Sequence, residues 1–402
     1  MSRCKMERII LHVDVNNAFL SWSAVWLLKN GYEKDIRNRY AIIAGDETQR
    51  RGIVLAKSNL CKKKGVKTAE AIYLARKKCP YLEIYPPRYD VYKKFSDMMY
   101  KYLCNYTNII ERYSIDECFL DYTGSVKLFG DPVKVAYKIK DEIYRKFGFT
   151  VNVGVGNNKL LAKMASDFEK PNKVHTLFSN EVETKMFPLP IDDLFMTGRA
   201  TAKKLREMGI TTIGELARTP MEELTKKFKS MGKMLHDYAN GIDNSEVTYE
   251  REQAKSISNS TVLPYNYRDS GMIKNVISDL SKEIGKRLRD NKLYADTIGI
   301  WFKYTYFDKI SKQVKLDNSI ANDEEIAGKA FSIFNELWNG EDGIRSVCVF
   351  VSGLSNERKV QLSLFDEKIE EEGDKLQEVI DDIRSKFGNS VIGFANEKNN
   401  DK

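Results

Sequence analysis

Three carboxylates stand at the ends of short apolar runs and could bind metal ions together. Asp116 and Glu117 are adjacent near the tip of Arg112–Asp121, whose alternation predicts a β-hairpin. Asp14 closes the apolar run Ile9–Val13, which predicts a strand. Neighbouring ionised carboxylates repel, so a cation is expected beside them, and the three acids could hold two divalent metals for in-line phosphoryl transfer. Alone, each acid would more often be a strand-end cap or a solvated charge.

The elements around these acids are expected to form a rigid support. Apolar spacing predicts strands at 9–14 and 150–155, a hairpin at 111–122, and helices at 90–107, 132–147 and 157–168. Without the residues between 18 and 81, this order is βαββαβ, the ferredoxin-like pattern, followed by a further helix. Asp14 and the hairpin would then lie on adjacent strands of one sheet, which is the support that a metal site needs.

Length and charge indicate a multidomain protein with a polyanionic partner. A chain of 402 residues is too long for a single hydrophobic core and should divide into several domains. Its composition, 42% hydrophobic and 30% charged residues, is ordinary for a globular protein. Residues 355–402 carry 8 basic and 12 acidic side chains, whereas residues 1–354 carry 57 basic and 45 acidic ones. The basic excess of residues 1–354 suits binding to a phosphate backbone, and a generic lysine-rich surface is the alternative. No apolar stretch reaches the ~18 residues of a membrane span, and the cysteines show neither metal nor disulfide spacing. We therefore expect a cytoplasmic protein with no membrane partner.

Four segments match, in order, the motifs of one protein family. His12–Phe19 is similar to its first motif, and Ser114–Glu117 matches its Ser-Ile-Asp-Glu motif at every position. Asn158–Asp167, continued by Lys170–Asn172, is similar to its third signature. On these residues the chain resembles the Y-family (translesion) DNA polymerases of the bacterial DNA polymerase IV type, over nearly its whole length.

The resemblance implies an α+β multidomain fold: a ferredoxin-like palm with a fingers insert, a helical helix-hairpin-helix thumb, and a C-terminal α+β little finger. The implied boundaries are 1–17 and 82–174 for the catalytic palm, 18–81 for the fingers, 175–242 for the thumb, 243–254 for a polar linker, 255–354 for the little finger and 355–402 for a tail. In the little finger, the spacing predicts strands at 295–306 and 344–352 and helices at 271–290 and 323–338.

The resemblance also assigns roles at the acids. Asp14, Asp116 and Glu117 would be the catalytic metal ligands and, with the Val15 carbonyl, would hold two Mg²⁺. Phe19 stands at the position of the family's steric gate, where a planar ring under the sugar excludes a 2′-OH and selects deoxynucleoside triphosphates. Without the resemblance, Phe19 would be interpreted as a core aromatic of the insert.

Nucleotide contacts are expected from the fingers and from the third signature. Asn59 and Lys62 stand where the family has a phosphate-binding Tyr and an Arg, so the positive charge is kept but the bidentate fork is lost. Lys170, before a Pro, matches the family's triphosphate-contacting Lys. Lys159 and Lys163, four residues apart on one helix face, are expected to be solvated unless the fold places them near the metals.

Two regions are expected to contact primer-template DNA. Met196–Ala217 resembles a helix-hairpin-helix, which presents backbone N–H groups to phosphates, although a purely structural helix pair is the alternative. Residues 254–319 carry 12 basic and 7 acidic side chains, which fits a sheet along the DNA backbone or a solvated face.

The tail carries a full match to the pentapeptide that binds the bacterial sliding clamp. Gln361, Leu362, Leu364 and Phe365 combine a polar hook with apolar anchors, and an extended peptide of this kind suits an apolar groove. An apolar stripe at helical spacing follows in 376–387 and is expected to pack on the body or on a partner.

The resemblance as a whole implies a monomeric, template-directed, low-fidelity translesion DNA polymerase without proofreading, associated with the nucleoid when active. A nucleotide cyclase is one rival, because cyclases also place metal carboxylates on a ferredoxin-like sheet. A catalytically weak DNA- and clamp-binding accessory is the other, supported by Asn59, Lys62, and Asn16, where the family often has a further Asp.

Overall fold

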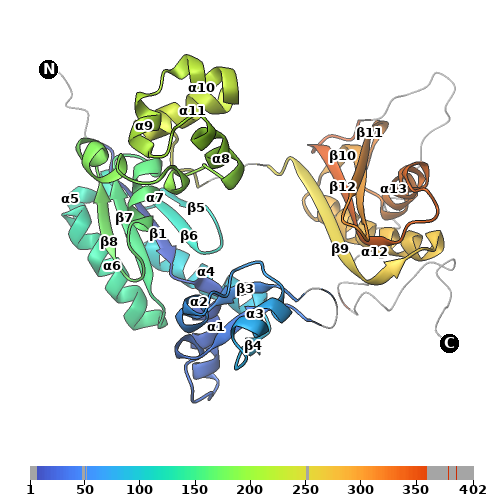
Figure 1. Cartoon of the computed structure of the whole chain (residues 1–402), viewed down its shortest axis with the longest axis horizontal. Coiled ribbons are helices and arrows are strands. Elements are labelled where there is room, and N and C mark those ends of the chain that lie inside the picture. Colours follow the sequence, from blue (N-terminus) through green and yellow to red (C-terminus); the bar gives the residue numbers. More distant parts are fainter. Residues whose placement is uncertain are drawn as a thin grey trace. The chain divides into compact units, whose positions relative to one another are not determined.

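The computed structural model describes residues 7–47, 50, 52–249, 253–359, 379 and 386, so Gln361, Leu362, Leu364 and Phe365 lie outside the described residues. The chain divides into two compact units, Met1–Glu47 with Gly52–Arg251, and Thr48–Arg51 with Glu252–Lys402. Figure 1 shows the helices and strands of each unit.

A five-stranded sheet in the order β5-β6-β1-β7-β8 forms the centre of the first unit (Figure 1). Its strands are β1 (Ile10–Val15), β5 (Ile110–Arg112), β6 (Glu117–Asp121), β7 (Val151–Gly156) and β8 (Val174–Leu177). The associated helices are α4 (Tyr89–Leu103), α5 (Val126–Phe129), α6 (Pro132–Phe147) and α7 (Lys159–Asp167). β1 pairs antiparallel with β6 and β7, which confirms the predicted ferredoxin-like order, and β8 adds a strand parallel to β7.

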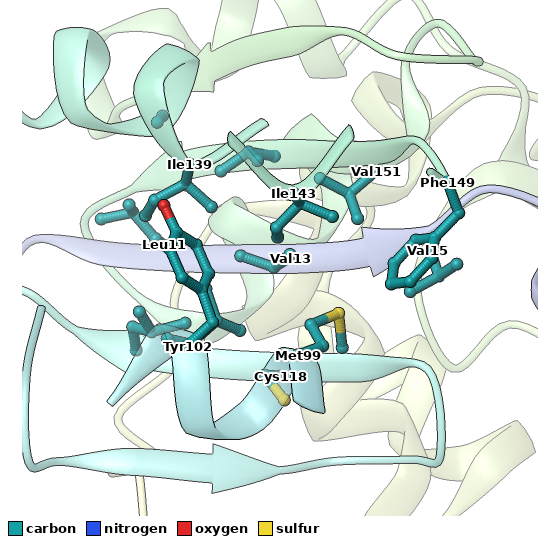
Figure 2. Packing of buried hydrophobic residues seen from close by; sticks show 14 of the residues in the cluster. Leu11, Val13, Val15, Met99, Tyr102, Cys118, Ile139, Ile143, Phe149 and Val151 are labelled. Carbon is teal, nitrogen blue, oxygen red and sulfur yellow. The ribbon is translucent and has the colours of Figure 1, made fainter. Parts of the chain in front are cut away.

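The two faces of β1 pack against different helices because strand side chains alternate. Leu11, Val13 and Val15 point into the main core with α4 and α6, as Figure 2 shows beside Met99 and Ile139. Burying an aliphatic side chain of this size contributes about 1.5–3 kcal/mol. The alternate positions of β1 face α7, so the same alternation directs Asp14 towards that helix.

Two glycines of β7 let α7 lie unusually close to the sheet. A Cβ on Gly154 would stand 1.9 Å from the Ala162 carbonyl oxygen, and one on Gly156 would stand 2.7 Å from the Ala162 nitrogen. Only a residue without a side chain permits such an approach. Any larger residue at either position would push α7, and the lysines that it carries, away from the acids.

The insert after β1 has its own three-stranded sheet, in the order β3-β2-β4. Its elements are α1 (Ala18–Lys29), β2 (Ala41–Ala44), β3 (Val54–Lys57), α2 (Asn59–Lys63), α3 (Ile72–Lys78) and β4 (Glu83–Tyr85). β4 pairs with β2 although it lies beyond residue 81, the expected end of the insert. α1 is buried on two sides, with Trp22 in the main core and Leu20 in the core of the insert.

Four short helices follow the palm elements and share a core with α7. They are α8 (Arg199–Glu207), α9 (Ile213–Arg218), α10 (Met221–Phe228) and α11 (Ser230–Ala239). The turn between α8 and α9 contains Gly209 at φ +81°, and Thr212 with Glu215 forms a capping box that starts α9. The predicted helical thumb with its helix-hairpin-helix is therefore confirmed.

The first half of the segment predicted to be a linker is bound to the first unit instead. Asp243 accepts a hydrogen bond from the Leu160 N–H at 3.1 Å, at the start of α7. Val247 is buried in a small cluster with Ile10, Phe119 and Ala162. The polar composition of 243–254 concealed this single apolar anchor, by which the start of the segment is fixed on the first unit.

Between residues 253 and 359, the second unit consists of a four-stranded antiparallel sheet in the order β11-β10-β12-β9 and two helices. Its elements are β9 (Ser256–Tyr267), α12 (Ser270–Asp290), β10 (Tyr294–Tyr304), β11 (Lys309–Ile320), α13 (Asp323–Leu337) and β12 (Ile344–Ser355). β10, β12 and both helices match the predicted elements within a few residues. β11 was not predicted, because edge strands are commonly polar and charged and this one carries three lysines.

Candidate active site

The strand pairing brings the three predicted acids to one end of the palm sheet. Asp14 lies directly opposite Glu117 in the β1–β6 ladder, and the Val15 N–H donates to the Asp116 carbonyl oxygen at 3.1 Å. Directly opposite residues on antiparallel strands have Cβ atoms about 5 Å apart. The backbone therefore fixes the spacing of these acids without help from their side chains.

Two lysines hold two of the acids from the side of α7. Lys163 on α7 forms an ion pair with Glu117, and Lys170 forms one with Asp14. Asp167 lies 2.7 Å from the Lys170 Nζ and 3.5 Å from the Lys163 Nζ, so it bridges the two ammonium groups. The two lysine ammonium groups therefore lie beside the acids for which the sequence analysis expected a metal cation.

Lys159 and Lys163 are not solvated, and for Lys163 the condition set for this expectation is met, because it lies at the acid cluster. Lys163 is buried, and Lys159 forms an ion pair with Glu111 at 2.7 Å while its Nζ stands 5.0 Å from the Phe119 ring centre. The close approach of α7 to β7 turns the lysine face of this helix toward the sheet. Glycine spacing in β7 was the sequence signal that could have revealed it.

Asp116 occupies a different environment from the other two acids. Its half-buried side chain accepts a hydrogen bond from the Ser114 hydroxyl at 2.6 Å, and the same hydroxyl lies 3.3 Å from Glu117. The Tyr113 N–H donates to the Glu117 carbonyl oxygen at 3.0 Å and closes the hairpin turn. Asp116 is thus held within the hairpin turn.

Burial and the lysines set the charge state of the site. Burial raises the pKa of Asp14 to about 6, and Lys170 only partly opposes this shift. Burial works against the charge of Lys170, but Asp14 and Asp167 outweigh it and raise the pKa of this lysine. The pKa of Lys163 is raised in the same way, against burial, mainly by Glu117 and Asp167.

Asp14→Asn should stabilise the metal-free chain near pH 8. The pKa of Asp14 rises from 3.8 to about 6 on folding, so the folded chain binds more protons between these values and stability is lost as the pH rises through them. The shift corresponds to a free energy of unfolding on the order of 3 kcal/mol. We expect the variant to melt about 5 °C or more above the parent chain at pH 8 in a chelator, and most of this difference to vanish at pH 4. Identical melting curves at pH 8 would contradict the assignment, and Asp167→Asn, at an exposed acid, is the control.

Two buried asparagines position the loop that carries Lys170. Asn16 accepts a hydrogen bond from the Asn172 N–H at 2.8 Å and donates to the Asn152 side-chain oxygen at 3.1 Å. Asn152 also donates to the carbonyl oxygens of Ser166 and Glu169. Asn152 was not predicted, although a single amide in the apolar strand β7 is the kind of signal that marks a buried polar network.

The acids fit a hard divalent cation by chemistry but do not converge on one point. Among the described residues, no three His, Cys, Asp or Glu side chains are close enough together to hold a metal ion. Asp14 and Glu117 point to their lysines, and Asp116 points to Ser114. All three offer carboxylate oxygens, the ligands that Mg²⁺ prefers, and two already bind a positive charge. The donor set therefore fits Mg²⁺ once the ammonium groups are displaced.

The predicted nucleotide-contacting residues lie on three different elements. Phe19 follows the acid strand on α1, half-buried, with its ring stacked on Tyr92 at 4.6 Å between centres and 8° between planes. Asn59 and Lys62 are exposed on α2 of the insert. Only Lys170 contacts one of the acids, so the structure joins this lysine directly to the candidate metal site.

Comparison with known protein families covers most of the chain. Residues 13–167 match the model of the impB/mucB/samB family, and residues 254–364 match the C-terminal domain of that family. Residues 192–243 match a model described as the DNA polymerase-iota thumb domain.

Similar proteins match this chain over most of its length. A protein named DNA polymerase IV from Clostridium acetobutylicum is 46% identical over 387 residues, which covers 96% of this chain and 97% of the relative. DNA polymerase IV 2 of Bacillus subtilis is 35% identical over 394 residues, covering 96% of this chain and 93% of the relative. A solved structure, the Y-family DNA polymerase chimera Dbh-Dpo4(243-245)-Dbh, aligns with a TM-score of 0.75 and 26% identity over 86% of this chain and 98% of its own.

Proposed function

The chain belongs to the impB/mucB/samB family of Y-family DNA polymerases and is a DNA-directed DNA polymerase of the translesion class, and we propose that it extends primers by two-metal phosphoryl transfer, without proofreading, after recruitment by the sliding clamp. The observation that carries the mechanism is the placement of Asp14 opposite Glu117 and beside Asp116 at one end of the palm sheet. The expected setting is the cytoplasm, on DNA, as a monomer.

The acids and their lysines would have different roles at the reacting phosphate: the acids would bind the metal ions, and Lys170 would bind the triphosphate. Asp14, Asp116 and Glu117, with the Val15 carbonyl, would hold two Mg²⁺, which when bound lower the pKa of the primer 3′-OH and neutralise the departing pyrophosphate. Lys170, with its side chain 39% exposed, would turn from Asp14 to the negative charge of the triphosphate. The β1–β6 ladder keeps the acids in place, because its backbone hydrogen bonds do not depend on the ligand.

Nucleotide selection would come from α1 and α2. Phe19 would contact the sugar of the nucleotide and exclude a 2′-OH. Tyr92 stacks on one face of the Phe19 ring and would limit the movement of this ring. Asn59 and Lys62 would meet the phosphates with one hydrogen-bonding amide and one ammonium, a weaker grip than that of Tyr and Arg. The support for this role is their exposure on a helix of the insert and their position in the family motif.

The exposed side of the second sheet would lie along the DNA backbone. Core residues such as Ile298 and Ile300 face α12 and α13, so the alternate positions face the other way. Those positions include Lys309, whose Nζ stands 4.7 Å from the Trp301 ring centre, and Lys315. A sheet face with exposed lysines suits contact with phosphates regardless of base sequence.

Replacing Lys309 and Lys315 with Ala should flatten the salt dependence of DNA binding. For every phosphate that is no longer neutralised, the slope of log affinity against log salt should fall by about 0.9. Lys274 and Lys329, on the helices of the opposite face, provide the matched control and should leave the slope unchanged. Primer–template affinity measured at several salt concentrations would test this, and equal slopes for both pairs would remove the sheet from the DNA interface.

The clamp proposal rests on the sequence of the tail and on its two large apolar anchors. Burying Leu364 and Phe365 in a groove would supply roughly 3–6 kcal/mol before ordering costs, which implies a contact in the micromolar range. Replacing both with Ala should leave synthesis on short primers unchanged and remove stimulation by the clamp. A double variant that still binds and responds to the clamp like the parent chain would show that the pentapeptide match is a coincidence.

The rival functions are less compatible with the chain. A nucleotide cyclase has no use for DNA contacts, whereas residues 192–243 and 254–364 match polymerase thumb and C-terminal domains. The accessory hypothesis drew on Asn16, but this residue is buried and holds the Lys170 loop, so an amide here has a positive role. Primer extension with Mg²⁺ on undamaged and abasic templates tests the function directly. Incorporation opposite template bases supports it, and DNA binding without incorporation would favour the accessory.

A further inference from the structure

His12 lies at the centre of the site but has no role in the chemistry described so far. It is fully buried on β1, between the candidate metal site and α7, and its ring packs at 4.5 Å from Phe119. Its Nδ1 lies 2.8 Å from the Ser166 hydroxyl oxygen. A buried imidazole beside a cluster of charges is an expensive feature unless both of its nitrogens are used.

Hydrogen-bond accounting fixes the tautomer of this ring. The Ser166 hydroxyl donates its only proton to the Lys163 carbonyl oxygen at 2.7 Å. Ser166 must therefore accept from His12, so the ring proton is on Nδ1 and the lone pair is on Nε2.

The free lone pair of His12 points at the acid that Lys163 occupies. His12 Nε2 is 3.9 Å from the Glu117 Oε1, and Lys163 is bonded to that same oxygen. Among the described residues, Nε2 is a buried atom with no hydrogen-bond partner. The Lys163 ammonium on that oxygen is therefore a donor close to an unused acceptor, although no hydrogen bond joins the two in this structure.

The ring is also held in register with the lysine. Ser166 lies one turn after Lys163 on α7, so the hydrogen bond from His12 ties the imidazole to the turn of helix that carries this lysine. A shift of α7 would move both groups together. The acceptor therefore keeps a fixed relation to the ammonium group, whatever occupies Glu117.

We propose that His12 is a positioning residue, and that its Nε2 and the Asp167 carboxylate receive the Lys163 ammonium when a divalent cation takes Glu117. The inference rests on the proposed metal function and adds the device that clears the site. Without an acceptor, Lys163 would either stay on Glu117 and compete with the metal, or stand unpaired in a buried place. Asp167 already lies 3.5 Å from Lys163, so a short movement of one side chain completes the exchange.

Mn²⁺ binding to the full chain with primer-template DNA tests the proposal, with free Mn²⁺ measured by electron paramagnetic resonance. His12→Leu should weaken Mn²⁺ affinity about tenfold, the value of one charge-assisted hydrogen bond. His12→Gln, whose amide oxygen can reach the place of Nε2, should recover most of it. In a Lys163→Met background, His12→Leu should have no further effect, because there is no ammonium group left to receive.

A merely structural role for His12 gives a different pattern. If the role is structural, His12→Leu would lower the melting temperature of the metal-free protein and weaken Mn²⁺ binding equally in both backgrounds. That result would overturn the proposal. A His12→Leu variant that binds Mn²⁺ like the parent chain would also overturn it. If the parent chain itself fails to bind Mn²⁺, the proposed metal function is what fails. If His12→Leu does not fold, His12→Asn, whose amide can still donate to Ser166 but does not reach the place of Nε2, takes its position in the cycle with Lys163→Met.

Discussion

Glu117→Ala should reduce primer extension by about a thousandfold or more and leave primer-template affinity within about twofold, since loss of metal-based charge stabilisation is worth several kcal/mol of barrier. The side chain is half-buried at the first residue of β6 and pairs with Lys163, so it faces the inside of the site. Asp116→Ala should behave in the same way. Single-nucleotide incorporation under single-turnover conditions and a separate DNA-binding titration would measure the two effects.

Glu111 provides a matched control for this experiment. It lies on the neighbouring strand β5 and pairs with Lys159 of the same helix, so its removal breaks a comparable ion pair outside the acid cluster. Glu111→Ala should keep most of the extension activity. Near-normal turnover in Glu117→Ala, or an equal loss in Glu111→Ala, would refute the assignment of the metal ligands.

The strands and helices of the palm could be predicted because residues close together in the sequence determine where each element begins and ends. The run Ile9–Val13, which is apolar apart from His12 and is followed by Asp14, predicts β1. The Asp131 cap with Pro132 and Gly148 delimits α6 at both ends. Strand order then follows from the ferredoxin-like succession, which puts Asp14 next to the hairpin. These are short-range signals, and they are sufficient for the backbone of the site.

The partners of the acids could not be predicted, because they depend on distances between elements. Lys163 has the sequence environment of a surface lysine, and only the glycines of β7 bring α7 close enough for it to reach Glu117. Val247 is one apolar residue in a polar segment, yet it fixes the start of the supposed linker. Tertiary packing decides such cases, and single-residue patterns carry little of that information.

Phe19→Ala should raise the incorporation of ribonucleotides relative to deoxyribonucleotides by about 10- to 100-fold, the range that steric discrimination of one small group provides. The ring of Phe19 stacks on Tyr92 and meets Tyr89 edge to face at 6.0 Å, so it is held by two aromatic neighbours of α4. Because a supported ring cannot swing aside, an added 2′-OH would clash with it. Truncation to Ala removes the obstacle and leaves the acids in place.

Phe95→Leu is the control that separates a gate from a packing residue. Phe95 belongs to the same core and packs on Trp22, but it is buried on the helix side of that core. Its replacement should lower the melting temperature and leave the ribonucleotide ratio unchanged. If Phe19→Ala lowers the melting temperature while the ratio also stays the same, Phe19 is a core aromatic of the insert and the 2′-OH is excluded elsewhere.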